Sequence, residues 1–115
     1  ARVAQLRACG LEVLDDIAAD SQGVWPVILL RLPSQQARDA VLKTHWCDGS
    51  GLSLPFVHVL PDYGCYDHVL GAARHDDVSQ ARDWAQRLLA ISNSPWLDDG
   101  RFARVLANIQ AATQG

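Results

Sequence analysis

Cysteine and histidine side chains near the middle of the chain are the first residues whose types and spacing could do chemistry. Cys65 and His68 have the spacing of two ligands of one zinc ion, and Cys47 and the other histidines are scattered around them. A structural zinc site normally takes its ligands from two such pairs, and the second pair is absent. We therefore expect no metal site, with Cys65 a small buried thiol and His68 a surface imidazole. A zinc-binding interaction module is the alternative that rests on this one pair.

Covalent catalysis and phosphate binding are not favoured by the sequence. A nucleophilic serine or cysteine needs a histidine within hydrogen-bond reach, and the chain has no G-x-S-x-G motif. The glycines of DGSG (48–51) precede a predicted strand rather than a helix, which indicates a plain turn. Three Asp-Asp pairs lie at predicted element ends, where aspartate serves turns and helix caps.

The composition is that of one ordinary globular domain. The 115 residues are 49% hydrophobic and 20% charged, with a net charge of -3. The chain is therefore long enough to bury a core and lacks the basic surface that nucleic acid requires. Its longest apolar stretch, VWPVILL, is too short to cross a membrane. Three cysteines without a close pair favour the reducing cytoplasm. Because the chain contains no methionine, we expect it to be part of a longer protein.

Hydrophobic periodicity predicts the helices and strands of the first half of the chain. Residues 1–8 predict the end of a helix that stops at Cys9-Gly10. Residues 11–17 and 24–33 predict two strands, the second of them apolar enough to be buried on both faces. Ser34 predicts the N-cap of a helix over 34–45. The apolar face of that helix is predicted to contain Ala37, Ala40, Val41 and Thr44.

The second half is predicted to alternate strands and helices. Residues 52–60 predict a strand kinked at Pro55, and residues 61–77 predict turns with one helical turn. A helix beginning at Ser79 and a last helix beginning near Asp98 flank a short strand over 88–91. Their predicted buried residues are Ala81, Trp84, Ala85 and Leu88, and then Phe102, Val105, Leu106 and Ile109.

This order of elements predicts an α+β fold over residues 1–115, as a single domain. We expect a two-layer sandwich in which a small mixed or antiparallel sheet carries helices on one face.

Three stretches, taken together, resemble the DegT/StrS family of sugar-nucleotide aminotransferases, and they cover about the whole chain. WPVILLRLPSQQARDAVL resembles the segment in which a strand of the small domain leads into a helix containing Arg-Asp, here Arg38-Asp39. GSGLSLPFVHVLPDYGCYDHVLG resembles the glycine turn, strand and proline-histidine loop that follow, with tyrosines at the loop's end. SQARDWAQRLLAISNSPWLDDGRFARVLANI is similar to the family's ending, in which an Ala-rich helix, a short strand and a Ser-Pro corner precede the last helix.

The resemblance implies the small C-terminal domain of a fold-type-I transferase that depends on pyridoxal phosphate (PLP), joined to a large N-terminal cofactor domain. PLP catalysis needs a lysine to hold the cofactor and an acid for its ring nitrogen. The only lysine here, Lys43, lies within the predicted helix 34–45 and lacks the family's surrounding motif. The resemblance therefore assigns no catalytic and no cofactor-binding residue to this chain. PLP is implied for the full-length enzyme, and the chain alone is expected to be inert.

What the resemblance does assign is a side of the substrate cleft. The family's proline-histidine loop maps to Pro55, Phe56 and His58, and its tyrosine to Tyr63. The family often has proline directly before the histidine, and here Val57 intervenes. The corner 92–96 is expected to be a connection, with Asn93 the one side chain there that could face the cleft.

The implied partners are the N-terminal PLP domain, a small-molecule amino donor and acceptor, and a second subunit of a homodimer. The competing interpretation is a stand-alone small α+β ligand-binding or regulatory interaction domain. That alternative predicts a self-contained pocket, whereas the aminotransferase interpretation predicts an apolar face left uncovered.

Overall fold

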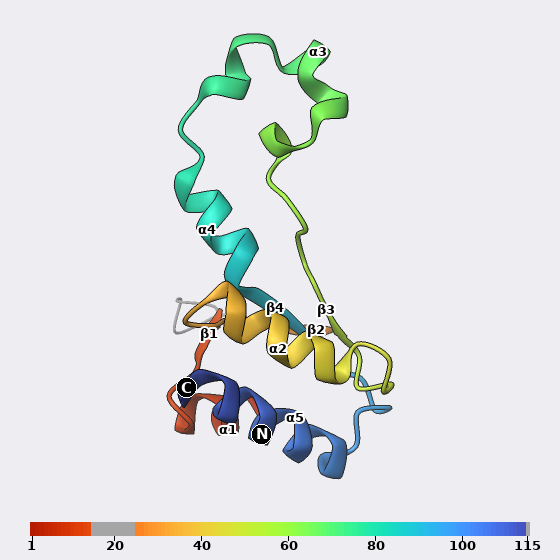
Figure 1. The fold of residues 1–115 in the computed structure, drawn as a ribbon. Coiled ribbons are helices and arrows are strands. Elements are labelled where there is room, and N and C mark those ends of the chain that lie inside the picture. Colours follow the sequence, from red (N-terminus) through yellow and green to blue (C-terminus); the bar gives the residue numbers. More distant parts are fainter. Residues whose placement is uncertain (15–24, 115) are drawn as a thin grey trace, which may run out of the picture.

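A four-stranded sheet packed against helices forms the body of the molecule, and a long arm projects from it (Figure 1). The computed structural model describes residues 1–14 and 25–114. Its helices are α1 (Arg2–Ala8), α2 (Gln35–His45), α3 (Asp67–Leu70), α4 (Ser79–Arg87) and α5 (Asp99–Gln114). Its strands are β1 (Glu12–Leu14), β2 (Val27–Arg31), β3 (Leu52–Ser53) and β4 (Leu88–Ser92). The predicted α+β fold is confirmed.

The sheet is antiparallel throughout, in the order β1-β2-β4-β3. Ile28 lies opposite Ile91 and Leu30 opposite Leu89, so these four side chains share one face of the sheet. All four are fully buried, and the helices cover this face. The core on that side contains Leu6 of α1, Val41 and Leu42 of α2, and Phe102, Val105 and Ile109 of α5.

The predicted strands 24–33 and 52–60 do contain strands, but these strands are shorter than predicted. The prediction that 24–33 is buried on both faces is wrong, because burial alternates along β2 and Val27 is 41% exposed. Ile28 and Leu30 point toward the helices and are buried, whereas Leu29 and Arg31 on the other face are only half-buried. The predicted strand 52–60 is also wrong beyond β3, since the chain leaves the sheet after Ser53. Pro55, which has no N–H to donate to a ladder, lies just past this point. The part of the predicted strand 11–17 that follows Leu14 lies outside the described residues.

Helix α2 is capped as predicted but buries a different face. The Ser34 Oγ accepts a hydrogen bond from the Ala37 N–H at 3.1 Å. Ala40 and Thr44, predicted to be apolar-face residues, are exposed. The buried side chains are those of Ala37, Arg38, Val41, Leu42 and His45. The difference has a physical cause, because Arg38 and His45 find polar partners in α4 and α5 that no periodicity can reveal.

Helix α4 differs most from its prediction. Ala85 is buried in α4 and Leu88 just after it, whereas Ala81 is exposed and Trp84 is 38% exposed. The apolar stripe exists, but α4 leaves the body and forms one side of the arm (Figure 1).

The predicted start and buried face of the last helix, α5, are confirmed. Asp98 caps it by accepting the Arg101 N–H at 2.7 Å, and Phe102, Val105 and Ile109 are buried, with Leu106 partly so.

Candidate functional site

The arm contains three of the four residues predicted to face a substrate cleft. Its ascending limb, residues 54–62, rises from β3 and ends in the short 3-10 turn η1 (Leu60–Asp62). Its tip carries η2 (Gly64–Tyr66), α3 and η3 (Gly71–His75), and α4 returns the chain to β4 (Figure 1). The molecule is elongated as a result, with extents of 48 × 37 × 27 Å.

An apolar groove lies between the ascending limb and α4. Its walls include Phe56, His58 and Leu60 from the limb and Ala81, Trp84 and Leu88 from α4 and its end, and it encloses about 540 Å³. Several of these side chains are open to solvent: Phe56 is 58% exposed and Leu60 is 53% exposed. The stripe of α4 that the sequence assigned to the core is therefore one wall of this groove.

The histidine and the tyrosine of the predicted site are in contact. The ring centroids of His58 and Tyr63 are 5.3 Å apart, with an angle of 73° between the ring planes. Tyr66 extends the row, at 6.2 Å from Tyr63. Edge-to-face pairing of this kind stabilises the mutual orientation of two rings. The structure thus brings Phe56, His58 and Tyr63 to one limb, with Phe56 and His58 facing the groove.

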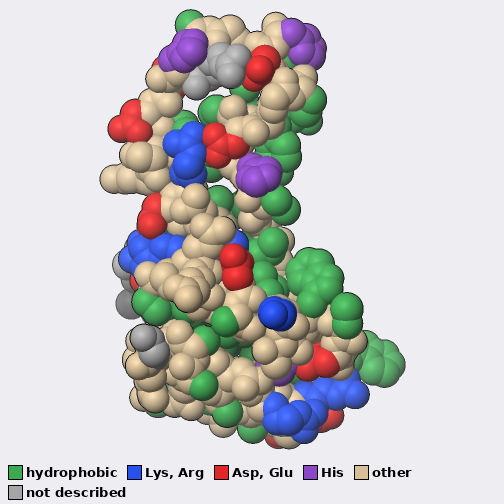
Figure 2. Space-filling model, in the orientation of Figure 1, with side chains coloured by type: hydrophobic (Ala, Val, Ile, Leu, Met, Phe, Trp, Pro, Cys, Tyr) green, Lys and Arg blue, Asp and Glu red, His purple; other side chains and the backbone are tan. Residues whose placement is uncertain are grey.

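An ion pair that the sequence did not indicate joins the two sides of the arm. Arg82 of α4 donates to Asp62 through both Nε (2.9 Å) and Nη2 (2.7 Å). The Arg82 guanidinium holds the pKa of Asp62 below its usual value, and the nearby His58 acts in the same direction. Twenty residues separate the partners, so no local pattern could have identified them. Basic, acidic and histidine side chains lie next to one another across the middle of the arm in Figure 2.

Three arginines fix the base of α4 on the body. Arg38 Nη1 donates to the Ala85 carbonyl at 2.8 Å, and Arg87 Nε donates to the Leu32 carbonyl at 2.8 Å. The Arg31 guanidinium lies over the Trp84 ring, 5.0 Å from its centroid. These contacts define the direction in which α4 leaves the sheet. The arm is therefore anchored to the body at the C-terminal end of α4.

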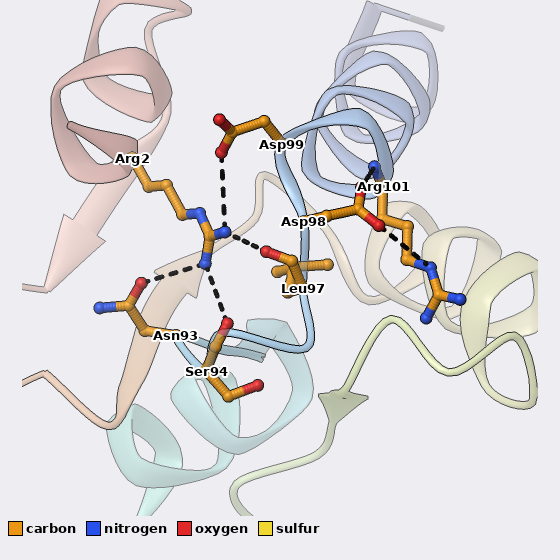
Figure 3. A network of polar contacts seen from close by, with 7 residues as sticks. All are labelled: Arg2, Asn93, Ser94, Leu97, Asp98, Asp99 and Arg101. Carbon is orange, nitrogen blue, oxygen red and sulfur yellow. Dashed lines mark hydrogen bonds and ion pairs between the residues drawn. The ribbon is translucent and has the colours of Figure 1, made fainter.

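Asn93, the fourth predicted cleft residue, is not brought together with the other three. It lies on the body, where its Nδ2 donates to the Trp25 carbonyl at 3.0 Å and its Oδ1 accepts from Arg2 at 3.3 Å. Figure 3 shows Arg2 of α1 reaching into this corner. The amide of Asn93 is thus engaged in holding segments of the body together.

The corner from Ser92 to Trp96 is a connection packed on α1. Arg2 donates to the carbonyls of Ser94 (3.4 Å) and Leu97, and its Nη2 lies 3.8 Å from the Asp99 carboxylate (Figure 3). The same guanidinium lies over the Phe102 ring at 5.4 Å. The chain leaves β4 and re-enters a helix at once because Arg2 satisfies the carbonyls of the turn.

A second polar cluster joins α2 to α5. The imidazole of His45 is 4% exposed, with Nδ1 2.5 Å from Asp48 Oδ2 and Nε2 2.7 Å from Asn108 Nδ2. Because the Asn108 amide nitrogen can only donate, Nδ1 carries the hydrogen donated to Asp48. Ser50 N–H donates to the other Asp48 oxygen at 2.8 Å. Every polar atom of the imidazole is satisfied, so this histidine supports the fold and is not free for catalysis.

The cluster gives a prediction for acid stability. Hydrogen bonds from Ser50, then from His45, lower the pKa of Asp48 from 3.8 to about 2. A lowered folded-state pKa adds stability that is present above the unfolded value and is lost as pH falls toward the folded value. Between pH 4 and pH 2, Asp48→Asn should therefore lose less stability than the unmodified chain in urea melts.

Asp83→Asn is the matched control, because Asp83 is an exposed carboxylate whose partner Arg87 lies one turn away on the same helix. Its stability should fall with pH as that of the unmodified chain does. If the Asp48→Asn curve ran parallel to the unmodified one, the Asp48 contacts would contribute nothing to acid stability.

The residues that could hold a metal or cofactor do not assemble into such a site in the described part of the chain. Among residues 1–14 and 25–114, no group of three or more His, Cys, Asp or Glu side chains is placed to bind a metal ion. Cys65, predicted to be buried, is exposed on η2, a turn that projects with the arm tip.

Lys43 does not fit a PLP site. It is exposed on α2, in a hollow of about 260 Å³ with Asp39, and that acid is paired with Arg38 at 2.8 Å. A lysine that holds PLP needs an enclosed site and an acid free to face the ring nitrogen.

Two further findings concern membrane spans and similarity to known proteins. None of the helices that the structure describes is both long and apolar enough to cross a lipid bilayer. No protein-family model, no curated protein and no solved structure matches the chain.

Proposed function

We propose that the chain is the small C-terminal domain of a PLP-dependent aminotransferase that acts on sugar nucleotides, and that its arm closes one side of the substrate cleft. The observation that carries this proposal is the exposure of large apolar side chains along the arm. They include Phe56 (58%), Val57 (57%), Leu60 (53%) and Val69 (66%). Phe56 and Leu60 line one groove, and exposed apolar surface of this kind is typical of a binding surface.

The chemistry of the arm suits substrate positioning rather than catalysis. The His58 imidazole is a hydrogen-bonding group on the wall of the apolar groove, and the Tyr63 ring packs against it. A polar group on an apolar wall is typical of a small-molecule site. The three residues that the resemblance carried over, Phe56, His58 and Tyr63, share the ascending limb and its end. Asn93 is omitted from the proposed cleft, because its amide is held by Arg2 and Trp25.

PLP enters the proposal only through the rest of the enzyme. The residues present do not fit the cofactor, so its lysine and its acid are assigned to the N-terminal domain. That domain and the second subunit of a homodimer are the proposed partners of the arm's apolar surface. We place the enzyme in the cytoplasm, since Cys9, Cys47 and Cys65 are free thiols.

The chain alone should bind no PLP. After incubation with PLP and dialysis, its near-ultraviolet and visible spectrum should match that of Lys43→Ala, because an exposed lysine forms no enclosed site. A longer protein that contains the chain should bind PLP stoichiometrically. A stoichiometric band in the chain that Lys43→Ala abolishes would overturn the domain assignment.

The groove itself favours a second candidate, a stand-alone ligand-binding domain. A hollow of about 540 Å³ with apolar walls lies within the range of small-molecule sites. The two proposals differ in how the chain binds an apolar probe such as ANS. A stand-alone domain should bind ANS saturably at one site, measured by the emission of ANS itself, and Trp84→Ala should weaken that binding. An arm that needs its partner domain should bind ANS at several sites.

A further inference from the structure

We propose that Arg82 is a positioning residue, which fixes His58 and Tyr63 at the place where they meet the substrate by holding Asp62 between them. The inference rests on the proposed function for the role of His58 and Tyr63. The positioning itself rests on contacts within this chain.

The turn that Asp62 closes carries both residues. Asp62 N–H donates to the Val59 carbonyl at 2.9 Å, and Tyr63 N–H donates to the Leu60 carbonyl at 3.2 Å. Within this turn Pro61 has a fixed φ. His58 precedes the turn directly and Tyr63 follows it, so a constraint on Asp62 acts on both flanks at once. The edge-to-face contact of the two rings closes the unit.

The constraint comes from the body through α4. That helix is held at its C-terminal end by two arginines. Arg38 of α2 donates to the Ala85 carbonyl within α4, and Arg87 of α4 donates to the Leu32 carbonyl just after β2. Arg82 lies one and a half turns before Arg87 and extends across the groove to Asp62. The ascending limb makes no ladder beyond Ser53. The limb lies beside α4 across the apolar groove, and the two hydrogen bonds from Arg82 add a directional contact between them.

The geometry requires arginine rather than any cation. Two N–H groups of one planar guanidinium meet two oxygens of one carboxylate, which fixes direction as well as distance. Both side chains are partly exposed, 42% for Arg82 and 30% for Asp62. Exposed pairs add little to global stability. Breaking the Arg82–Asp62 pair should therefore displace His58 and Tyr63 without lowering the melting temperature.

The test is nuclear Overhauser transfer between the His58 and Tyr63 ring protons in the folded chain. Arg82→Gln and Asp62→Asn should each reduce it to less than about half, with Arg82→Lys intermediate, because one ammonium cannot make both bonds. The double variant Asp62→Arg, Arg82→Asp should restore it. Gln86→Ala, which shortens an exposed polar side chain of the same helix, should leave the transfer unchanged. Melting temperatures should agree throughout.

Activity in the longer enzyme separates this inference from the proposed function. Arg82→Gln should lower kcat/KM about fivefold, mostly through KM, since a small displacement of binding groups weakens substrate contact. If ring-to-ring transfer survived in both Arg82→Gln and Asp62→Asn, the positioning role would be refuted, whatever His58→Ala did. If transfer were lost but His58→Ala kept full activity, the proposed function would be wrong instead, and with it the role of Arg82 in catalysis.

Discussion

Replacing Phe102 with alanine should lower the free energy of unfolding by about 3–5 kcal/mol. The ring is 3% exposed and packs in the core that α5 shares with the sheet, and the Arg2 guanidinium covers one of its faces at 5.4 Å. Truncation would leave a cavity at the point where α1 and α5 meet and remove the cation–π partner of Arg2. Such a loss is a large share of the roughly 5–15 kcal/mol that a domain possesses.

Urea melts measure this loss, and Arg104→Ala on the exposed face of the same helix is the control. Its effect should stay within about 0.5 kcal/mol, as for most surface substitutions. Phe102→Leu should fall between the two, because leucine fills most of the space but offers no ring to Arg2. If Phe102→Ala lost less than about 1 kcal/mol, α5 would be peripheral and the assigned core would be wrong.

The parts of the fold that were predictable are those that local chemistry dictates. Ser34 and Asp98 predicted the starts of two helices. The side chain of an N-cap residue accepts a hydrogen bond from the backbone N–H three residues later, as both of these do. The stripe from Phe102 to Ile109 predicted the buried face of α5 correctly, because Phe102, Val105 and Ile109 pack in the core. The sequence left the sheet mixed or antiparallel, and the structure shows that it is antiparallel throughout.

The arm was not predictable, because periodicity reports that a helix has an apolar side and not what covers that side. Ala81 and Trp84 form such a stripe, yet they face a groove rather than the core. Residues 52–60 alternate like a strand, and only Leu52–Ser53 pairs with a neighbour. The burial of Arg38 and His45 could not be predicted from the sequence, because their hydrogen-bond partners lie in other helices.

The candidate site, too, could be predicted only in part from the sequence. Phe56, His58 and Tyr63 lie within eight positions of one another in sequence, and one limb with its end keeps them together. Asn93 was grouped with them through the resemblance alone, and the structure places it with Arg2 on the body. The pair Asp62–Arg82, which joins the two sides of the arm, required the fold to be known.

In the proposed full-length aminotransferase, His58→Ala and Tyr63→Phe should each lower kcat/KM by a factor of ten or more, which is about 1.4 kcal/mol of transition-state binding. Each change removes one hydrogen-bonding group from the side of the proposed cleft. His58 is exposed and Tyr63 is half-buried on the arm, away from the core. Melting temperatures should therefore barely change.

Steady-state kinetics of His58→Ala, measured beside His68→Ala in the same full-length enzyme, is the most direct test that the arm closes the substrate cleft. Both histidines are exposed on the arm, and His68 lies on α3 at its tip. We predict at least a tenfold loss of kcat/KM for His58→Ala, a loss of less than about twofold for His68→Ala, and unchanged melting of both. Full activity of His58→Ala, or activity lost only together with the fold, would contradict the account.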